Sequence, residues 1–177
     1  LGMQLSSRNL NSIIELNQAS SFVIVESGIK YGDLGKELHS KGWALHNLAS
    51  LPHISVGGSC ATATHGSGVN NGNLATALQG FELLTPGGDL LWVDPETNAD
   101  LFYAGGVSMG ALGIMTKVKL AIQPTFEVSQ RVFENLPMDA LKENFDTIMS
   151  AGYSVSFFTH WLDKNINQVW VKSREDK

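Results

Sequence analysis

The sequence predicts an α+β fold in which an antiparallel sheet packs with helices. Two apolar runs flank a Pro-Gly-Gly turn in LQGFELLTPGGDLLWVD, the pattern of a β-hairpin with a short loop. In contrast, KYGDLGKELHSKG has apolar residues at helical spacing. Hairpin strands and separate helices in one chain are typical of the α+β class.

The chain begins with a strand followed by a helix. SFVIVESG is rich in Val, Ile and Phe and ends at a glycine, which predicts a strand. Tyr31, Leu34 and Leu38 predict the next helix, and Gly42 occupies the place of a left-handed C-terminal cap. The apolar patch of Ile54 and Val56 is too short for a helix, so we expect a brief strand that passes into a loop.

The middle of the chain predicts a helix and a strand. TNADLFYAGG offers Thr97 or Asn98 as the N-cap of a helix that Gly105 and Gly106 weaken. GIMTKVKLAIQP alternates as a strand that Pro124 closes. One face of this strand is expected to carry Ile114, Thr116, Val118, Leu120 and Ile122, and the other Lys117 and Lys119.

A new series of predicted strands and one helix begins after Pro124. FEVSQRVF predicts a strand, Pro137 opens a helix that runs to about Ala151, and YSVSFFTHW and NQVWVKS predict two more strands. We therefore expect two domains, residues 1–123 and 124–177.

Composition favours a small-molecule partner. The formal net charge is -5 over 177 residues and no cluster of Lys and Arg is present, so we expect neither nucleic acid nor an anionic membrane as partner. Cys60 alone cannot form an internal disulfide framework, and no apolar run approaches the ~20 residues of a membrane span. We expect a cytoplasmic protein. The opening LGMQLSSRNL has neither an initiator Met nor a secretory signal, so we expect a fragment.

The stretch SLPHISVGGSCATATHGSG, residues 50–68, consists mainly of small residues. Backbone N–H groups without bulky side chains can approach an anion to about 3 Å. Three interpretations remain open. A flexible connector fits the composition, but Leu51, Ile54 and Val56 suggest anchoring, and residues 61–64 (ATAT) are poor linker material.

A nucleophile elbow and a phosphate cradle are the other two interpretations. GGSCA would make Ser59 the nucleophile, but CATATHGSG is a poor helix, and Asp94 and His160 do not indicate a triad. A cradle would use the N–H groups of residues 57–59 and further hydroxyl donors. Its expected members are Gly57, Gly58 and Ser59 through the backbone, and Ser55, Thr62 and Thr64 through their hydroxyls.

A metal site is not expected. His53 and His65 lie twelve residues apart with no Cys or carboxylate at ligand spacing, and His65 precedes a Gly-Ser-Gly turn as a structural histidine would. Cys60 lies among small residues and is interpreted as a buried small hydrophobe.

The quoted Gly-rich stretch, together with GALGIMTKVKL, resembles the FAD-binding (PCMH-type) domain of the vanillyl-alcohol-oxidase superfamily. NLASLPHISVGGSCATATHGSG is similar to the alditol oxidase group, which includes xylitol oxidase. FENLPMDAL and YSVSFFTHWLDKNINQVWVKSRE are similar to the start of that group's substrate domain. The resemblance implies that residues 1–123 form the second lobe of the FAD-binding domain and that 124–177 begin the substrate domain.

The resemblance also implies cofactor contacts. It places the FAD diphosphate along residues 55–62, the turn at His65 to Gly68 in support, the adenine end at the backbone of Ile114, and Ser50 near the flavin and the substrate hydroxyls. The full implied set is Asn47, Ser50, Ser55, Gly57, Gly58, Ser59, Ala61, Thr62, His65, Gly68, Ser108 and Ile114.

The implied activity is the FAD-dependent oxidation of a polyol, such as xylitol or sorbitol, with O2 reduced to H2O2. A sugar-lactone oxidase of the same superfamily and a non-catalytic flavin-binding module are the alternatives. The resemblance places the flavin-linking histidine before Leu1 and the residues that handle the substrate hydroxyl after Lys177, so no residue here is assigned as catalytic. The sequence predicts no oligomeric state.

Overall fold

The computed structural model describes residues 4–162 and 164–175, which divide into two compact units. The first contains residues 4–66 and 73–125, and the second contains residues 67–72 and the described part of 126–175. Within the described residues, no helix is long and apolar enough to cross a membrane.

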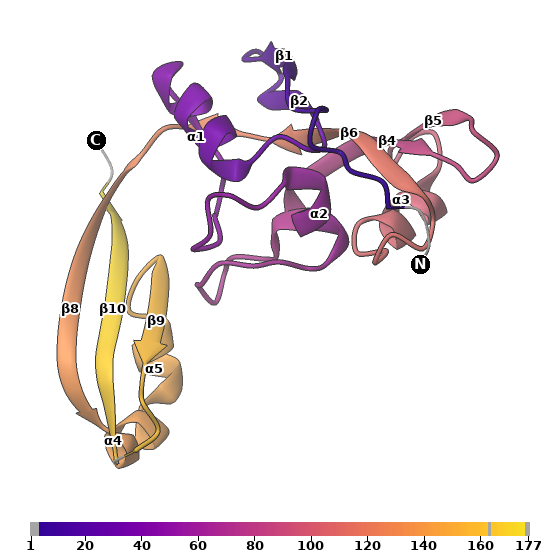
Figure 1. Cartoon of the computed structure of the whole chain (residues 1–177). Coiled ribbons are helices and arrows are strands. Elements are labelled where there is room, and N and C mark those ends of the chain that lie inside the picture. Colours follow the sequence, from indigo (N-terminus) through magenta and orange to yellow (C-terminus); the bar gives the residue numbers. More distant parts are fainter. Residues whose placement is uncertain (1–3, 163, 176–177) are drawn as a thin grey trace. The chain divides into compact units, whose positions relative to one another are not determined.

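The first unit contains a five-stranded antiparallel sheet in the order β1-β2-β6-β4-β5, with helices packed on it (Figure 1). Its elements are β1 (Ile13–Asn17), β2 (Phe22–Glu26), α1 (Tyr31–Ser40), β3 (Trp43–Ala44), α2 (Val56–Ala61), the 3-10 helix η1 (Leu74–Ala77), β4 (Leu78–Leu84), β5 (Leu90–Val93), α3 (Ala99–Gly105), β6 (Ile114–Ala121) and β7 (Gln123–Pro124). The short strands β3 and β7 pair separately.

Several sequence predictions are confirmed in this unit. The strand β2, the helix α1 and the β4–β5 hairpin lie where expected. Gly42 follows α1 with φ of +81°, a conformation that glycine adopts without steric cost. Asn98 caps α3 by accepting a hydrogen bond from the N–H of Leu101 at 3.2 Å.

The alternation predicted for β6 is wrong at its start. Leu83 pairs with Met115 but Glu82 pairs with Lys117, so Thr116 is the extra residue of a β-bulge. The bulge shifts the alternation, and Met115 is buried while Ile114 and Thr116 are only half-buried. From Val118 onwards the predicted core face is confirmed.

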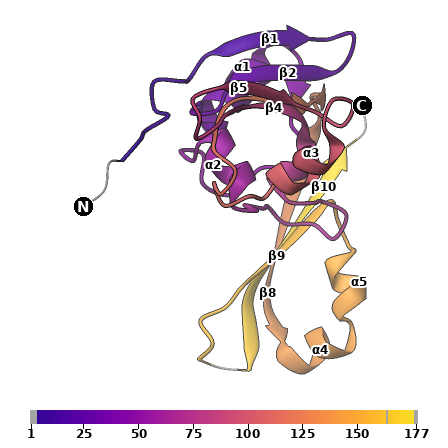
Figure 2. The same ribbon diagram turned by 90° about the vertical axis from the view of Figure 1, so that its right-hand side faces the viewer.

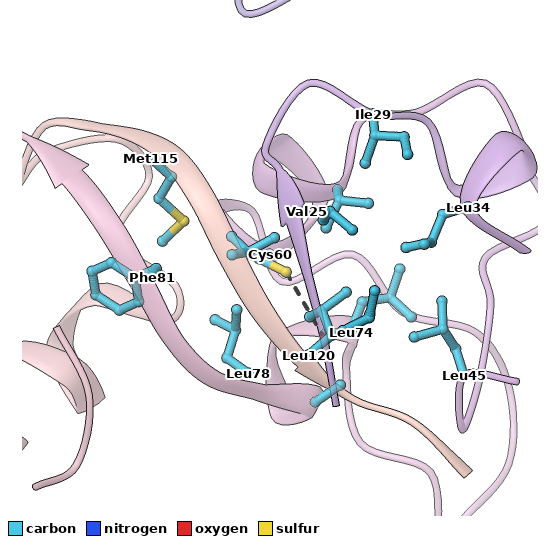
Figure 3. Packing of buried hydrophobic residues seen from close by; sticks show 14 of the residues in the cluster. Val25, Ile29, Leu34, Leu45, Cys60, Leu74, Leu78, Phe81, Met115 and Leu120 are labelled. Carbon is cyan, nitrogen blue, oxygen red and sulfur yellow. Dashed lines mark hydrogen bonds between the residues drawn. The ribbon is translucent and has the colours of Figure 1, made fainter. Parts of the chain in front are cut away.

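The core of the first unit lies between the sheet and the helices. Figure 3 shows Cys60 of α2 among buried side chains of the strands and of η1. Phe81, Val118 and Leu120 from the sheet and Leu34 from α1 are completely buried in the same cluster. Packing against this core holds α2 in place beside β6.

The second unit is a three-stranded antiparallel sheet in the order β8-β10-β9 with two short helices (Figure 2). Its elements are β8 (Glu127–Pro137), α4 (Met138–Glu143), α5 (Phe145–Met149), β9 (Ser154–Phe158) and β10 (Asn165–Glu175). The predicted strands are confirmed. The predicted single helix is instead two, because Asn144 has φ of -124° and ψ of 24° and interrupts it.

The second unit has a separate, smaller core. Leu141, Val155, Ile166 and Val169 are buried together, and the side chains of α4 and α5 help to cover them. The fold class predicted from the sequence, α+β, is confirmed for the chain.

Candidate cofactor site

Helix α2 lies in the middle of the Gly-rich stretch, and the loop after β2 holds the first turn of this helix. The N–H of Val56 donates to the carbonyl of Ile29 at 2.9 Å, and the N–H of Gly57 donates to that of Ser27 at 2.8 Å. A Cβ on Gly57 would lie 2.7 Å from the Cβ of Ser27. Gly57 therefore allows the helix to pack closely against this loop, and its N–H is used by the protein itself.

The brief strand predicted around residues 54–56 is thus wrong, since residues 56–61 are helical. Glycine has low helix propensity, but tertiary contacts override it here. Val56 and Cys60 are completely buried, and Ser59 is nearly so. The hydroxyl and the N–H of Ser59 both donate to the carbonyl of Ser55, at 2.7 and 3.0 Å. Ser59 is therefore neither an exposed nucleophile nor an exposed donor.

The opposite side of α2 has almost no side chains. Gly58 and Thr62, one turn apart, are exposed, and Ala61 beside them is half-buried. We call these three residues the bare face. A Cβ on Gly58 would approach only the Oγ of Ser55, at 2.8 Å. The hydroxyl of Thr62 donates to the carbonyl of Gly58 at 3.0 Å and lies 3.2 Å from that of Thr64.

Backbone donors flank the bare face. Within the described part of the chain, the N–H groups of Gly58, His65 and Gly66 have no protein acceptor. The Nδ1 atom of His65 lies 2.8 Å from the carbonyl oxygen of Gly66, in agreement with a structural role. N–H groups without a protein acceptor beside a surface without bulky side chains fit a diphosphate, because each can donate to an anionic oxygen.

The other predicted cofactor residues lie in three segments. The Oδ1 of Asn47 accepts from the N–H of Leu48 at 2.9 Å, and Ser50 is exposed in the loop before α2. Ser108 precedes Met109, whose N–H donates to the carbonyl of Ala61 at 2.9 Å, so that loop reaches the end of α2. Ile114 pairs with Leu84 at the start of β6, and Gly68 belongs to the second unit.

Two titratable groups lie beneath α2. The hydroxyl of Tyr31 is 3.8 Å from the sulfur of Cys60, and both side chains are buried. Burial raises the pKa of Cys60 to about 11 and raises the pKa of Tyr31 above its usual value. Cys60 is therefore a protonated core residue at neutral pH, as the sequence predicts. The described residues contain no group of three His, Cys, Asp or Glu side chains that could hold a metal ion.

The sequence contains a signal for α2 that composition hides. Val56 and Cys60 are four residues apart and lie on one helical face. In this helix the N–H groups of Gly57 and Ser59 donate to the carbonyls of Ser27 and Ser55. No local sequence pattern predicts that these two N–H groups are used within the protein.

The fold of the chain is shared with a solved enzyme structure. The cholesterol oxidase of Brevibacterium sterolicum superposes on 96% of this chain with a TM-score of 0.83, at 16% sequence identity and over 35% of its own length. Likeness at this identity shows the fold alone.

The chain belongs to the family of FAD binding domains, whose model matches residues 2–94. It is similar to the alditol oxidase of a Streptomyces species, with 44% identity over 92% of this chain. It is also similar to the L-gulonolactone oxidase of Mus musculus, with 32% identity over 96% of this chain. It spans 38% of the length of each. The family resemblance is confirmed, and FAD is the cofactor of this family.

Proposed function

We propose that the chain is the cofactor-binding region of an FAD-dependent alcohol oxidase, with the beginning of its substrate domain. The proposed substrate is an alditol, such as xylitol or sorbitol. The observation that carries this proposal is the bare face of α2 with neighbouring N–H groups that have no acceptor within the described residues, in a chain 44% identical to an alditol oxidase over 164 residues. Domains at 1–123 and 124–177 and a cytoplasmic location are parts of the same proposal.

The diphosphate of FAD would lie along the bare face. The N–H groups of Gly58, His65 and Gly66 would donate to its oxygens, and the hydroxyl of Ser55 is an additional donor. The hydroxyl of Thr62 already donates to the carbonyl of Gly58, so Thr62 would border the diphosphate without donating to it. Gly57 and Ser59 hold the helix that presents these groups. Asn47, Ser108 and the backbone of Ile114 would contact other parts of the cofactor, and Gly68 would support the turn.

When bound, FAD supplies a two-electron acceptor that O2 can reoxidise. The overall reaction balances because the CH2OH group loses two hydrogens to become an aldehyde, while O2 gains two hydrogens to become H2O2. The residues of this chain hold the cofactor and replace water around the diphosphate. None of them is proposed as the base.

Ser50 is the one proposed substrate contact. It is exposed, in the loop that leads into α2. Ser50→Ala should leave FAD content unchanged and lower kcat/KM for xylitol about two- to tenfold, because one hydrogen bond contributes ~0.5–1.5 kcal/mol. Steady-state kinetics on the protein that contains this chain measures the effect. Unchanged kinetics with xylitol and sorbitol would make Ser50 a turn residue.

A substrate panel with peroxide detection tests the proposed activity. Xylitol, sorbitol, L-gulono-1,4-lactone and D-arabinono-1,4-lactone would each be added to the FAD-loaded protein. Turnover of the alditols supports the proposal, whereas turnover of the lactones alone would favour the lactone oxidase alternative, which similarity to L-gulonolactone oxidases keeps open. FAD binding without flavin reduction by any of the four would indicate a non-catalytic module.

A further inference from the structure

The residue proposed to contact the substrate lies in the loop between β3 and α2. Ser50 is exposed there, and we call residues 49–55 the Ser50 loop. A hydroxyl group can meet a substrate at a defined position only where the backbone that carries it is fixed. The contacts of the Ser50 loop with the rest of the first unit therefore decide where this hydroxyl lies.

The start of helix α1 holds the middle of the Ser50 loop. The N–H of Gly32 donates to the carbonyl of Pro52 at 2.8 Å, and the N–H of Tyr31 donates to that of Ile54 at 3.1 Å. The first N–H groups of a helix have no partner within the helix. Lys30, the N-cap residue of α1, supplies no side-chain hydrogen bond to them. The loop carbonyls therefore take the place of a capping side chain.

Gly32 also allows the loop to approach α1 closely. A Cβ at this position would lie 3.0 Å from both the Cβ and the carbonyl oxygen of Pro52. Because both distances are shorter than ordinary van der Waals contact, a side chain on residue 32 would move Pro52 by a few tenths of an ångström. A Cβ on Gly35, three residues later, would have no atom of another described segment within 4 Å. Of these two glycines of α1, only Gly32 faces the loop.

The other end of the loop is fixed independently of α1. A Cβ on Gly66 would lie 2.5 Å from the carbonyl oxygen of Leu48, which shows how closely these two residues pack. Ser50 lies midway in sequence between Leu48 and Pro52. A displacement of Pro52 therefore moves the backbone of Ser50 without releasing the loop.

We propose that Gly32 is a positioning residue, which fixes Pro52 and, through it, the hydroxyl of Ser50. The inference rests on the proposed function, because that function assigns Ser50 to the substrate. Its physical basis is that misplacement of a contact group by ~1 Å can lower a rate about 100-fold, so a smaller displacement has a measurable effect.

The test uses the full FAD-loaded protein with matched substitutions at the two glycines of α1. Gly32→Ala and Gly32→Val place a small and a larger side chain against Pro52, and Gly35→Ala and Gly35→Val are the controls on the same helix. Each variant is also combined with Ser50→Ala. Steady-state kcat and KM for xylitol, FAD content and amide hydrogen exchange of residues 31–32 are measured. Thermal unfolding reports general destabilisation.

Gly32→Ala should lower kcat/KM for xylitol about two- to fivefold, and Gly32→Val should lower it further, up to the loss caused by Ser50→Ala. Both should change kcat and KM in the same proportion as Ser50→Ala does. Exchange at residues 31–32 should become about three- to tenfold faster, as expected for a weakened hydrogen bond. The Gly35 variants should keep the kinetics and the exchange rates of the original protein.

FAD content should stay unchanged in the Gly32 variants, because the carbonyls of Ser27 and Ile29 hold the first turn of α2. When Ser50 is already alanine, the Gly32 substitutions should have no further effect on kcat/KM. Two independent sites would instead have additive effects on the free energy of activation.

Unchanged kcat/KM in Gly32→Val, or an equal loss with and without Ser50→Ala, would overturn the positioning role and leave the proposed function intact. A loss of kcat/KM that Gly35→Val matches, together with a lower melting temperature in both, would also overturn it, because general destabilisation would then be the cause. If the original protein oxidises no alditol, the proposed function itself fails, and the positioning of a substrate contact fails with it.

Discussion

At the scale of single residues, two neighbouring glycines have different roles. Gly57 is buried against Ser27 and donates its N–H to the carbonyl of that residue, whereas Gly58 is exposed and its N–H has no acceptor in the described part of the chain. The local sequence GGSCA does not distinguish the two glycines, but the structure does, because Gly57 is buried and Gly58 is exposed. Substitutions at the two glycines should therefore have different effects.

Gly58→Val should leave the fold intact and abolish most FAD binding, because the branched side chain would occupy the bare face. Gly57→Ala should instead destabilise the first unit by ~1–3 kcal/mol, because its Cβ would lie 2.7 Å from that of Ser27. Flavin content and chemical denaturation separate the two effects. A Gly58→Val protein with full FAD content would show that the diphosphate lies elsewhere.

The buried pair of Tyr31 and Cys60 predicts sensitivity to alkali. The pKa of Cys60 is raised from 9.0 to about 11, so its contribution is fully present below pH 9 and is lost as the pH rises through about 11. The free energy of unfolding should fall by on the order of 2–3 kcal/mol over this range. Tyr31, whose pKa is also raised, adds to the loss at higher pH.

Denaturation curves at pH 8, 10 and 11 measure this alkaline loss. Cys60→Ala removes the titrating thiol, so the variant should be less stable at pH 8 but should lose less stability between pH 9 and 11. An equal loss in the variant and the original protein would assign the alkaline effect to other groups.

At the scale of elements, the bulge in β6 creates a polar contact on the outer side of the sheet. The hydroxyl of Thr116 donates to Glu82 at 2.7 Å, and Lys117 forms an ion pair with the same carboxylate at 3.0 Å. Desolvation acts to raise the pKa of Glu82, but the hydrogen bonds from Thr116 and Lys117 and the charge of Lys117 outweigh it, and the pKa is lowered.

Thr116→Val tests this contact with little change of shape. The lowered pKa of Glu82 gives stability that is present above its unfolded value of 4.5 and lost as the pH falls through the folded value. The variant should be less stable by ~1 kcal/mol at pH 7, and the difference should shrink in acid. Urea denaturation at pH 7 and pH 3.5 measures both values. A constant difference across this range would contradict the assigned role of the carboxylate.

At the scale of the whole molecule, two separate cores predict two separately responding units. Val118 is completely buried in the first core and Val169 is 3% exposed in the second. Val118→Ala and Val169→Ala should each destabilise their own unit by about 2 kcal/mol.

Amide hydrogen exchange rates in the individual strands test this prediction. Val118→Ala should speed exchange in β2 and β6 and leave β10 unchanged, and Val169→Ala should have the reverse effect. Equal acceleration in both sheets by either variant would mean that the units unfold as one.

Local patterns were sufficient for much of the fold. Periodicity predicts α1 and β2, the Pro-Gly-Gly turn predicts the β4–β5 hairpin, and Asn98 predicts the start of α3. These elements depend on residues close in sequence, so the spacing of apolar residues and the capping residues can be read from the sequence. The Gly-rich stretch also offered a diphosphate cradle as one of three interpretations, because a lack of side chains is itself a sequence property, and the cradle stays a prediction.

Only the tertiary structure decided the rest. Residues 56–61 are helical because Ser27 and Ile29 accept their first N–H groups and because Val56 and Cys60 are buried in the core. The register of β6 depends on a bulge opposite Glu82 and Leu83, and the position of Ser67 depends on hydrogen bonds to β9, more than eighty residues later. Such contacts join distant segments, so much of the energy that selects between strand and helix, or decides whether an N–H group has a protein acceptor, comes from residues far away in the sequence.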